Sequence, residues 1–378
     1  MAAISVIQNY LLESGKTVIG CSMEDLIDRL YNDIFEYSIL TDPLKDIWVN
    51  RISVNGWNDI RVWFANGKSH QIEGFISQQQ ATETIGRLLT DSGLNCNTPF
   101  VQGKLRSMDA NITVYRNPVT QAGIRCIIRK SSKRVFTEKD YITSEFASQK
   151  ELNFLKIALQ HGISILLTGL RQSGKTSFME YLTRSIPDYL NVTIAEKGYR
   201  EIESGNELLF TDERQNELII KANGVDSDIL AFNFSSWAAL KASQYISSVI
   251  AQSVGHDPKV GLSCLAYDWM DKYPCDFTQA ASQACEAFPI VVFLNMLPDR
   301  KRRIMSISES HFENGQITLN PLWQYKINNM TADESGTKIQ GHHVQTGYLS
   351  DELIGRMKLF GVTPSEIQSM KREENTDA

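Results

Sequence analysis

Apolar and polar positions in the first 130 residues alternate in short blocks with helical or strand-like spacing. After Ser22, the expected N-cap, apolar residues recur at helical spacing, which predicts an amphipathic helix. A second helical pattern spans 78–91, and Asn66-Gly67 predicts a hairpin turn. Strand-like runs lie at 46–50, at 59–64, just after Gly67 and in three pieces between 100 and 130. The combination predicts an α+β domain at residues 1–130, built on a mostly antiparallel sheet.

From residue 151 onward, strand-like apolar runs alternate with longer helical patterns. This order predicts an α/β domain with a mainly parallel sheet and helices on its faces. The expected strands are 163–168, 192–195, 228–232, 260–265, 290–294, 304–307 and 316–319. The expected helices are 152–159, the segment after 175, 237–254, 277–288, 353–360 and 364–370. The polar stretch 131–150 predicts a linker, so that the second domain spans 151–378 and ends in short helices.

Composition and charge narrow the class of protein. A net charge of −6 argues against a dedicated nucleic-acid-binding protein, and we expect no direct nucleic-acid binding. The cysteines are scattered without C-x-x-C or other metal-ligand spacing, which favours reduced thiols in a cytoplasm. The N-terminus lacks the pattern of a secretory signal. The apolar stretch at 289–297 is too short for a membrane span, and the one at 230–254 is too polar.

The strongest chemical signal is a glycine-rich turn between a strand-like run and a helical pattern. Residues 169–176 have the sequence Gly-Leu-Arg-Gln-Ser-Gly-Lys-Thr, which fits G-x-x-x-x-G-K-[ST]. The glycines allow backbone N–H groups to converge on phosphate oxygens at a helix N-terminus. Lys175 is expected to reach the β- and γ-phosphates of ATP, and the Thr176 hydroxyl to bind Mg²⁺. The candidate cofactor-binding residues of the loop are Gly169, Leu170, Arg171, Gln172, Ser173, Gly174, Lys175, Thr176 and Ser177.

Motifs along most of the chain resemble those of the type II and type IV secretion ATPases, above all the tight-adherence (Flp) pilus and conjugal-transfer branch. The similar segments, with the family pattern in parentheses, are 46–50 (E-I-M-V-N), 99–105 (P-M-V-D-A-R-L), 128–130 (I-R-K), 255–257 (G-H-[DP]) and 302–309 (R-R-V-T-S-I-T-E). The resemblance implies a RecA-like P-loop domain, ATP and Mg²⁺ as cofactors, and a homo-oligomeric ring of six subunits. It also implies a cytoplasmic protein, peripheral at the inner membrane, that acts with secretion or pilus machinery there.

Three residues outside the loop are further candidates, and the role of Arg129 among them comes from the resemblance. Arg129 would lie near the nucleotide at the face between the two domains, and His256 would sense the γ-phosphate. Glu196 follows a strand beside the loop and could orient water or Mg²⁺. A solvated arginine, a structural histidine and an exposed loop carboxylate are the alternative interpretations. The expected catalytic residues are Lys175, Glu196 and His256.

The chain departs from the family at positions that matter for catalysis. In the family motif T-I-E-D the first acid is replaced by Ala195, and Asn233 stands where the Walker B glutamate is expected. The second family histidine falls at Ala266, and Lys104 replaces an arginine.

These departures leave two functions open. One is an ATP-hydrolysing ring subunit that powers type IV secretion, conjugation or pilus assembly. The other is a nucleotide-binding but catalytically weak subunit that regulates or scaffolds such a machine. A small-molecule kinase would share only the loop, and the long N-terminal domain counts against it.

The basic run 301–303 is interpreted as a solvated turn.

Overall fold

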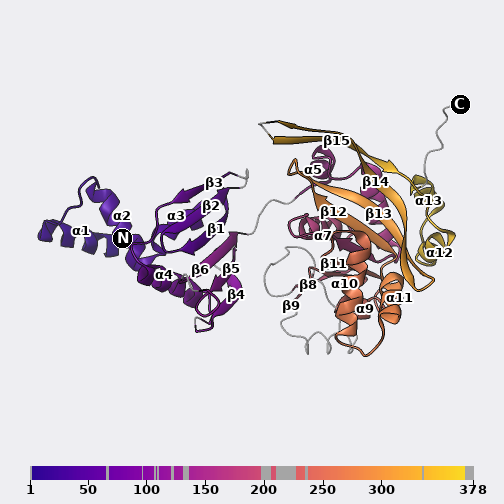
Figure 1. The fold of residues 1–378 in the computed structure, drawn as a ribbon, viewed down its shortest axis with the longest axis horizontal. Helices are drawn as coiled ribbons and strands as arrows, with labels where there is room; N and C mark the ends of the chain where they lie inside the picture. Colours follow the sequence, from indigo (N-terminus) through magenta and orange to yellow (C-terminus); the bar gives the residue numbers. More distant parts are fainter. Residues whose placement is uncertain are drawn as a thin grey trace. The chain divides into compact units, whose positions relative to one another are not determined.

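The chain forms two compact units. A computed structural model describes residues 2–64, 68–95, 97–105, 108, 110–120, 123–130, 136–196, 206–209, 227–234, 237–333 and 336–370. The first unit lies within Met1–Lys133, and the second holds the described residues from Phe136 on. In Figure 1 the first unit is indigo and purple, and the second runs from magenta to yellow.

The first unit is a six-stranded antiparallel sheet with helices, in the strand order β3-β2-β1-β6-β5-β4. Its helices are α1 (Ala2–Ser14), α2 (Met23–Phe35), the 3₁₀ turn η1 (Ser38–Leu40), α3 (Thr41–Lys45) and α4 (Gln78–Asp91). Its strands are β1 (Val49–Gly56), β2 (Asp59–Phe64), β3 (Ser69–Ile72), β4 (Phe100–Leu105), β5 (Ala110–Tyr115) and β6 (Arg125–Lys130). Ile85, Leu88 and Leu89 of α4 share one buried cluster with alternate residues of the strands. The antiparallel sheet is therefore confirmed.

A local signal marks the start of α2. The Ser22 side chain accepts a hydrogen bond from the Asp25 N–H, so the helix after it begins where its N-cap was expected. The hairpin turn expected at Asn66-Gly67 lies outside the described residues.

The second unit contains a nine-stranded mixed sheet in the order β15-β14-β13-β12-β7-β11-β10-β8-β9. The strands from β12 to β9 run parallel, and the pairs from β12 to β15 are antiparallel. The strands are β7 (Ile165–Thr168), β8 (Val192–Glu196), β9 (Asn206–Leu209), β10 (Ile229–Phe232), β11 (Ser248–Ser253), β12 (Ile290–Met296), β13 (Arg302–Glu313), β14 (Gln316–Asp333) and β15 (Gly336–Gln345). The expected mainly parallel α/β arrangement is confirmed.

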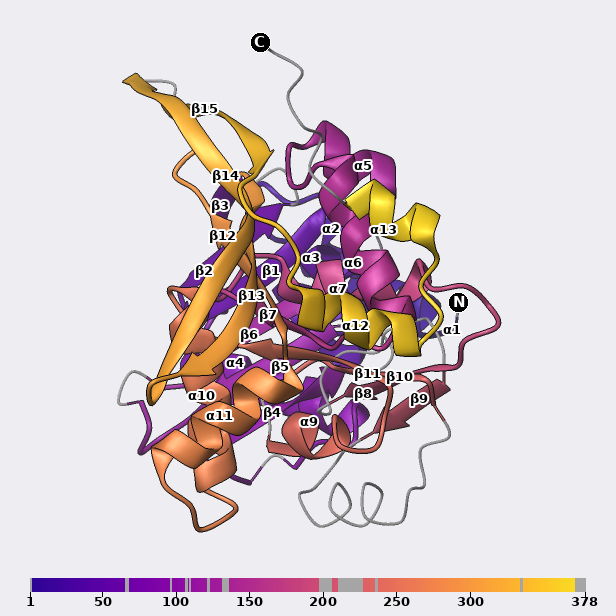
Figure 2. The same cartoon turned by 90° about the vertical axis from the view of Figure 1, so that its right-hand side faces the viewer.

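Helices cover both faces of this sheet, as Figure 2 shows. The helices are α5 (Glu138–Thr143), α6 (Gln149–Gln160), α7 (Lys175–Arg184), α9 (Trp237–Ala242), α10 (Pro258–Met270), α11 (Phe277–Ala287), α12 (Asp351–Leu359) and α13 (Pro364–Met370). Helices α5, α6, α7, α12 and α13 contribute to one buried cluster, and α9, α10 and α11 to another. Neighbouring residues of β7 face opposite clusters, since Ile165 and Leu167 belong to the first and Leu166 to the second. The loop after β7 therefore starts from a strand that is buried on both sides.

Two expectations in this unit are wrong. Residues 237–254 are not one helix but α9 followed by the central strand β11, and 260–265 belong to helix α10 rather than to a strand. All six residues of β11 are buried between β7 and β10, so the strand lacks alternation of polar and apolar residues. Helix α10 begins with an Asp257 N-cap and Pro258, a start signal that the apolar run after it obscured.

The segment that precedes α6 is packed into the second unit. Within the stretch that we interpreted as a linker, Tyr141, Phe146 and Ala147 are buried against residues of α6 and α7. The ring of Phe146 lies 5.1 Å from that of Phe178, between centroids.

Among the described residues, no helix is both long enough and apolar enough to cross a lipid bilayer.

Candidate functional site

The glycine-rich loop lies between β7 and α7, as the sequence predicts. Gly169 has φ = 151°, and a side chain there would put its Cβ 2.1 Å from the Leu294 carbonyl oxygen on β12. Gly174 has φ = 99° and is the N-cap residue of α7. Both positions thus require glycine, one for close packing on the neighbouring strand and one for its left-handed backbone. Gln172, with φ = 70°, shares that conformation without being glycine.

Lys175 points its ammonium group back into this loop. Its Nζ donates hydrogen bonds to the Gly169 carbonyl oxygen at 2.7 Å and to the Leu170 carbonyl oxygen at 3.0 Å. Burial lowers the pKa of Lys175 to about 8. The group therefore remains largely protonated at pH 7. A partly buried cation at the N-terminus of α7 attracts anions more strongly than an exposed one.

Thr176 is oriented by a residue that the sequence analysis missed. Its hydroxyl donates to Oε1 of Gln252 at 3.2 Å. Gln252 is buried on β11, and its Nε2 lies 3.3 Å from the sulfur of Met179. The sequence did not predict this contact, because the segment around Gln252 was assigned to a helix.

The loop offers polar groups that suit a phosphate and its metal ion. The Ser173 hydroxyl is buried and has no hydrogen-bond partner among the described residues. The hydroxyl of Thr176 faces the Gln252 amide. The described residues contain no cluster of three His, Cys, Asp or Glu side chains that could hold a metal ion. Mg²⁺ takes few protein ligands and is completed by substrate phosphates and water, so the Thr176 hydroxyl oxygen could serve as one of its ligands.

The other candidate residues of the second unit lie at the carboxyl ends of parallel strands. His256 follows β11, the neighbour of β7, while Asn233 follows β10 and Glu196 ends β8. The Asn233 N–H donates to the Ala195 carbonyl oxygen at 3.2 Å, so these two chain segments lie side by side. Because carboxyl ends of parallel strands share one edge of a sheet, these residues are on the same edge as the loop. The side chain of Glu196 lies outside the described part of the structure.

His256 lies at this edge but faces solvent. Its side chain is 73% exposed, and Nε2 lies 3.3 Å from Oδ2 of Asp257. The second family histidine falls at Ala266, directly after the strand expected at 260–265. That strand is wrong, because these residues lie in helix α10, where Ala266 is buried. Gly261 of that helix lies so close to β7 that a Cβ would be 2.2 Å from Oγ1 of Thr168. β11, one of the two strands beside β7, ends at Ser253, and residues 254–256 follow it.

Arg129 belongs to the first unit. It is exposed on β6, in register with Arg51 on β1 and Asn111 on β5. Burial lowers the pKa of Arg51, and the positive charge of Arg129 lowers it further. Neither arginine has a carboxylate partner within the described ranges, so this part of the sheet carries uncompensated positive charge.

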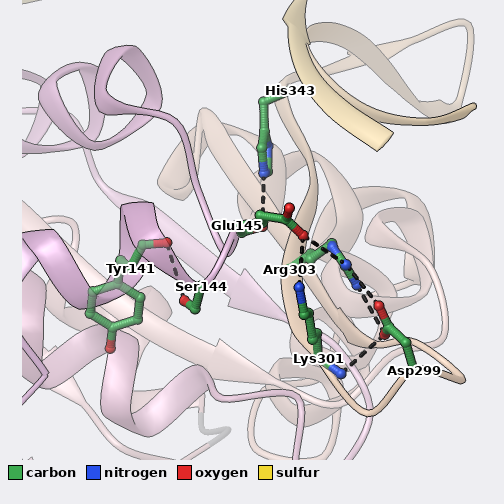
Figure 3. A network of polar contacts seen from close by, with 7 residues as sticks. All are labelled: Tyr141, Ser144, Glu145, Asp299, Lys301, Arg303 and His343. Atoms are coloured by element: carbon green, nitrogen blue, oxygen red, sulfur yellow. Dashed lines mark hydrogen bonds and ion pairs between the residues drawn. The ribbon is translucent and has the colours of Figure 1, made fainter. Parts of the chain in front are cut away.

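The basic run 301–303 is not a solvated turn throughout. The Arg303 side chain is fully buried and forms ion pairs with Asp299 at 2.8 Å and with Glu145 at 3.3 Å. Lys301 pairs with the same Glu145 at 3.0 Å. Figure 3 shows this network between the β12–β13 turn and the segment after α5. The interpretation as a solvated turn is wrong for Arg303 because the two carboxylates offset the cost of burying its charge.

His343 on β15 extends the same network. Its Nε2 lies 3.2 Å from the Glu145 carbonyl oxygen (Figure 3), and its Nδ1 lies 2.9 Å from Oε2 of Glu151, which is fully buried. Burial lowers the pKa of His343, but the hydrogen bond and the negative charge of Glu151 outweigh this effect and the pKa is raised. A protonated His343 thus ties β15 to the start of α6.

This pair should make the stability of the second unit depend on pH. Because the folded state raises the pKa of His343, its contribution is present below the unfolded value of about 6.5 and is lost as the pH rises through the folded value. We expect His343→Gln to lower the free energy of unfolding by about 1–3 kcal/mol at pH 6 and by less at pH 8.5. Thermal unfolding at both pH values measures this difference. The neighbouring His342 is exposed, and His342→Gln is the matched control. An equal loss at both pH values would contradict the assigned role of the ion pair.

The chain was also compared with known proteins. No protein-family model and no curated protein sequence matches it. Among solved structures, the VirB11 ATPase from the Brucella suis type IV secretion system, in complex with sulphate, is similar with 15% identity and a TM-score of 0.35, over 75% of this chain and 96% of that one. The pilus retraction motor PilT with bound ADP is similar with 11% identity and a TM-score of 0.49, over 85% and 86%. The ATPase DotB of Legionella pneumophila is similar with 12% identity and a TM-score of 0.46, over 72% and 79%.

Proposed function

We propose that this chain is an ATP-binding subunit of a secretion or pilus machine and that it holds the nucleotide on the loop 169–176. The observation that carries the proposal is the geometry of this loop. Its two glycines have backbones suited to phosphate, and the Lys175 ammonium lies within it at the start of α7. The hydroxyls of Ser173 and Thr176 flank that cation in the sequence.

Each of these groups has a defined task when ATP and Mg²⁺ bind. Lys175, which now donates to two loop carbonyl oxygens, would donate to phosphate oxygens instead. The loop N–H groups and the Ser173 hydroxyl donate to the same phosphates. Gln252 would hold the Thr176 hydroxyl in place by accepting its hydrogen bond, which would leave the hydroxyl oxygen available to Mg²⁺. The metal ion, when bound, neutralises charge on the phosphates.

The proposal also concerns the rate of ATP hydrolysis, which we infer to be slow. Asn233 at the end of β10 can position a water molecule but cannot take its proton. Glu196 is the nearby carboxylate that we assign to that task, and His256 is the candidate sensor of the γ-phosphate. The loss of the expected acid favours a nucleotide-binding subunit that regulates or scaffolds the machine over a fast motor.

Titration calorimetry of the purified protein tests the binding step. We expect ATP to bind in the presence of Mg²⁺, and the absence of binding would refute the proposal. Steady-state ATPase measurements on the same sample then separate a fast motor from a slow subunit.

The proposal includes assembly into a homo-oligomeric ring, expected to have six subunits, on the cytoplasmic side of the inner membrane. Arg129 is exposed, and with Arg51 it forms a positive site that could meet a neighbour's nucleotide. An interface between two different surfaces of the same protein closes into a ring when its rotation closes. Light scattering with ATP and Mg²⁺ should therefore report a closed oligomer. Monomers alone at high protein concentration would contradict this part of the proposal.

A further inference from the structure

The three basic residues 301–303 have three different surroundings. Lys301 and Arg303 each pair with a carboxylate, at 3.0 Å and 2.8 Å respectively. The side chain of Arg302 has no carboxylate partner in the part of the chain that the structure describes. Its Nε instead donates a hydrogen bond of 2.8 Å to the carbonyl oxygen of Gln172 in the loop.

The backbone of Arg302 is held firmly in this place. Arg302 is the first residue of β13 and pairs in register with Met296 at the end of β12. On one side, the Leu297 N–H donates to the Lys301 carbonyl oxygen at 2.9 Å. On the other side, the buried Arg303 is anchored by Asp299. These contacts fix the point from which the Arg302 side chain leaves the sheet.

The Arg302 side chain runs along the N-terminus of α7. A Cβ at Gly174, the N-cap residue, would lie 3.1 Å from Cδ of Arg302. A larger residue at position 174 would therefore force this side chain to shift by a few tenths of an ångström. The guanidinium group lies beside the same loop that contains the Lys175 ammonium.

The chemistry of the guanidinium points to an anion. The contact with Gln172 uses only the Nε–H, while the four N–H bonds of the two terminal nitrogens have no protein acceptor among the described residues. Arg302 is also exposed, so a ligand can reach these groups. A planar fork of N–H donors matches phosphate oxygens, and the attraction adds to that of Lys175 and of the helix N-terminus.

We propose that Arg302 is a second cationic residue, besides Lys175, that binds phosphate at this loop. It holds the loop through Gln172 and donates its terminal N–H groups to the phosphates of a nucleoside di- or triphosphate. This inference rests on the function proposed above and adds to it a residue from outside the loop. It also explains why the run 301–303 directs its middle residue away from the carboxylates that bind the other two.

Competition binding with a fluorescent ATP analogue tests the inference, with ATP, ADP and inorganic pyrophosphate as competitors. Arg302→Gln keeps a donor that can reach the Gln172 carbonyl but removes the charge. We expect it to weaken binding of all three ligands about tenfold or more, with Arg302→Lys intermediate. The affinity of Arg302→Gln should also depend less steeply on salt, a change that a merely structural role would not cause. Arg300→Gln is the matched control, since Arg300 is exposed in the same turn.

The possible results separate the two claims. If the wild type binds none of the ligands, the proposed function fails and this inference fails with it. If the wild type binds but Arg302→Gln binds equally well, only the role of Arg302 is overturned. A loss of affinity with an unchanged salt dependence, or with a lower melting temperature that Arg302→Lys shares, would assign Arg302 to loop structure and would also overturn the inference.

Discussion

Replacing Lys175 by alanine should lower the affinity of the protein for ATP at least about a hundredfold. The ammonium group is partly buried at the start of α7, where a phosphate would replace the two carbonyl oxygens that it now contacts. Two charge-assisted hydrogen bonds to phosphate, each of about 1.5–3 kcal/mol, would be lost. Each 1.4 kcal/mol corresponds to about a tenfold change in affinity.

Titration calorimetry with ATP and Mg²⁺ measures this change. Lys358→Ala is the matched control, because Lys358 is exposed on α12. Far-UV circular dichroism and the melting temperature establish that Lys175→Ala is folded, since the substitution also removes the hydrogen bonds within the loop. Equal ATP affinity in the wild type and in folded Lys175→Ala would mean that the loop does not bind phosphate.

Hydrolysis should be slower than in an ordinary secretion motor by about 10²–10⁴, because that is the usual cost of losing a general base. The structure has Asn233 after β10, where the family resemblance expects a glutamate. If the missing carboxylate is the cause, Asn233→Glu should raise the turnover rate by about a hundredfold or more. The glutamine of Asn233→Gln has the same size as glutamate but no charge, so this variant should leave the turnover rate unchanged.

Glu196 provides a second test of the same idea. We expect Glu196→Gln to remove most of the remaining turnover, because no other nearby carboxylate was identified from the sequence. A steady-state ATPase assay with the wild type and the three variants decides the matter. Fast wild-type hydrolysis that survives Glu196→Gln would show that the catalytic carboxylate has been assigned to the wrong position.

Local signals in the sequence predict the loop, and non-local packing explains what they miss. The backbone angles at Gly169 and Gly174, and the close approach of Gly169 to β12, require glycine. Both requirements are visible in the sequence as glycines at fixed positions of the motif. The strand–turn–helix around them was therefore predictable. The neighbour strand β11 was not, because a strand buried on both faces has no period of two to distinguish it from a helix.

Helix α10 was also assigned wrongly, in this case as a strand. Gly261 packs against Thr168 of β7, so a small residue stands where an amphipathic helix would have a large apolar one. The contact between Gln252 and Thr176, and the direction of the Arg302 side chain, depend on which strands are neighbours in the sheet. Such pairings arise from tertiary structure, and the order of residues along the chain does not reveal them.

The position of β7 also has a consequence for biosynthesis. β7 is the middle strand of its sheet, yet its two partners come much later in the chain, with β11 beginning at Ser248 and β12 at Ile290. Gly169 packs against Leu294 of β12, so the loop lacks one wall until that strand has left the ribosome. Contacts between distant parts of a chain form late and slowly. A nascent chain therefore carries the complete loop sequence long before it can bind a nucleotide, and ATP would stabilise only chains whose synthesis has passed β12.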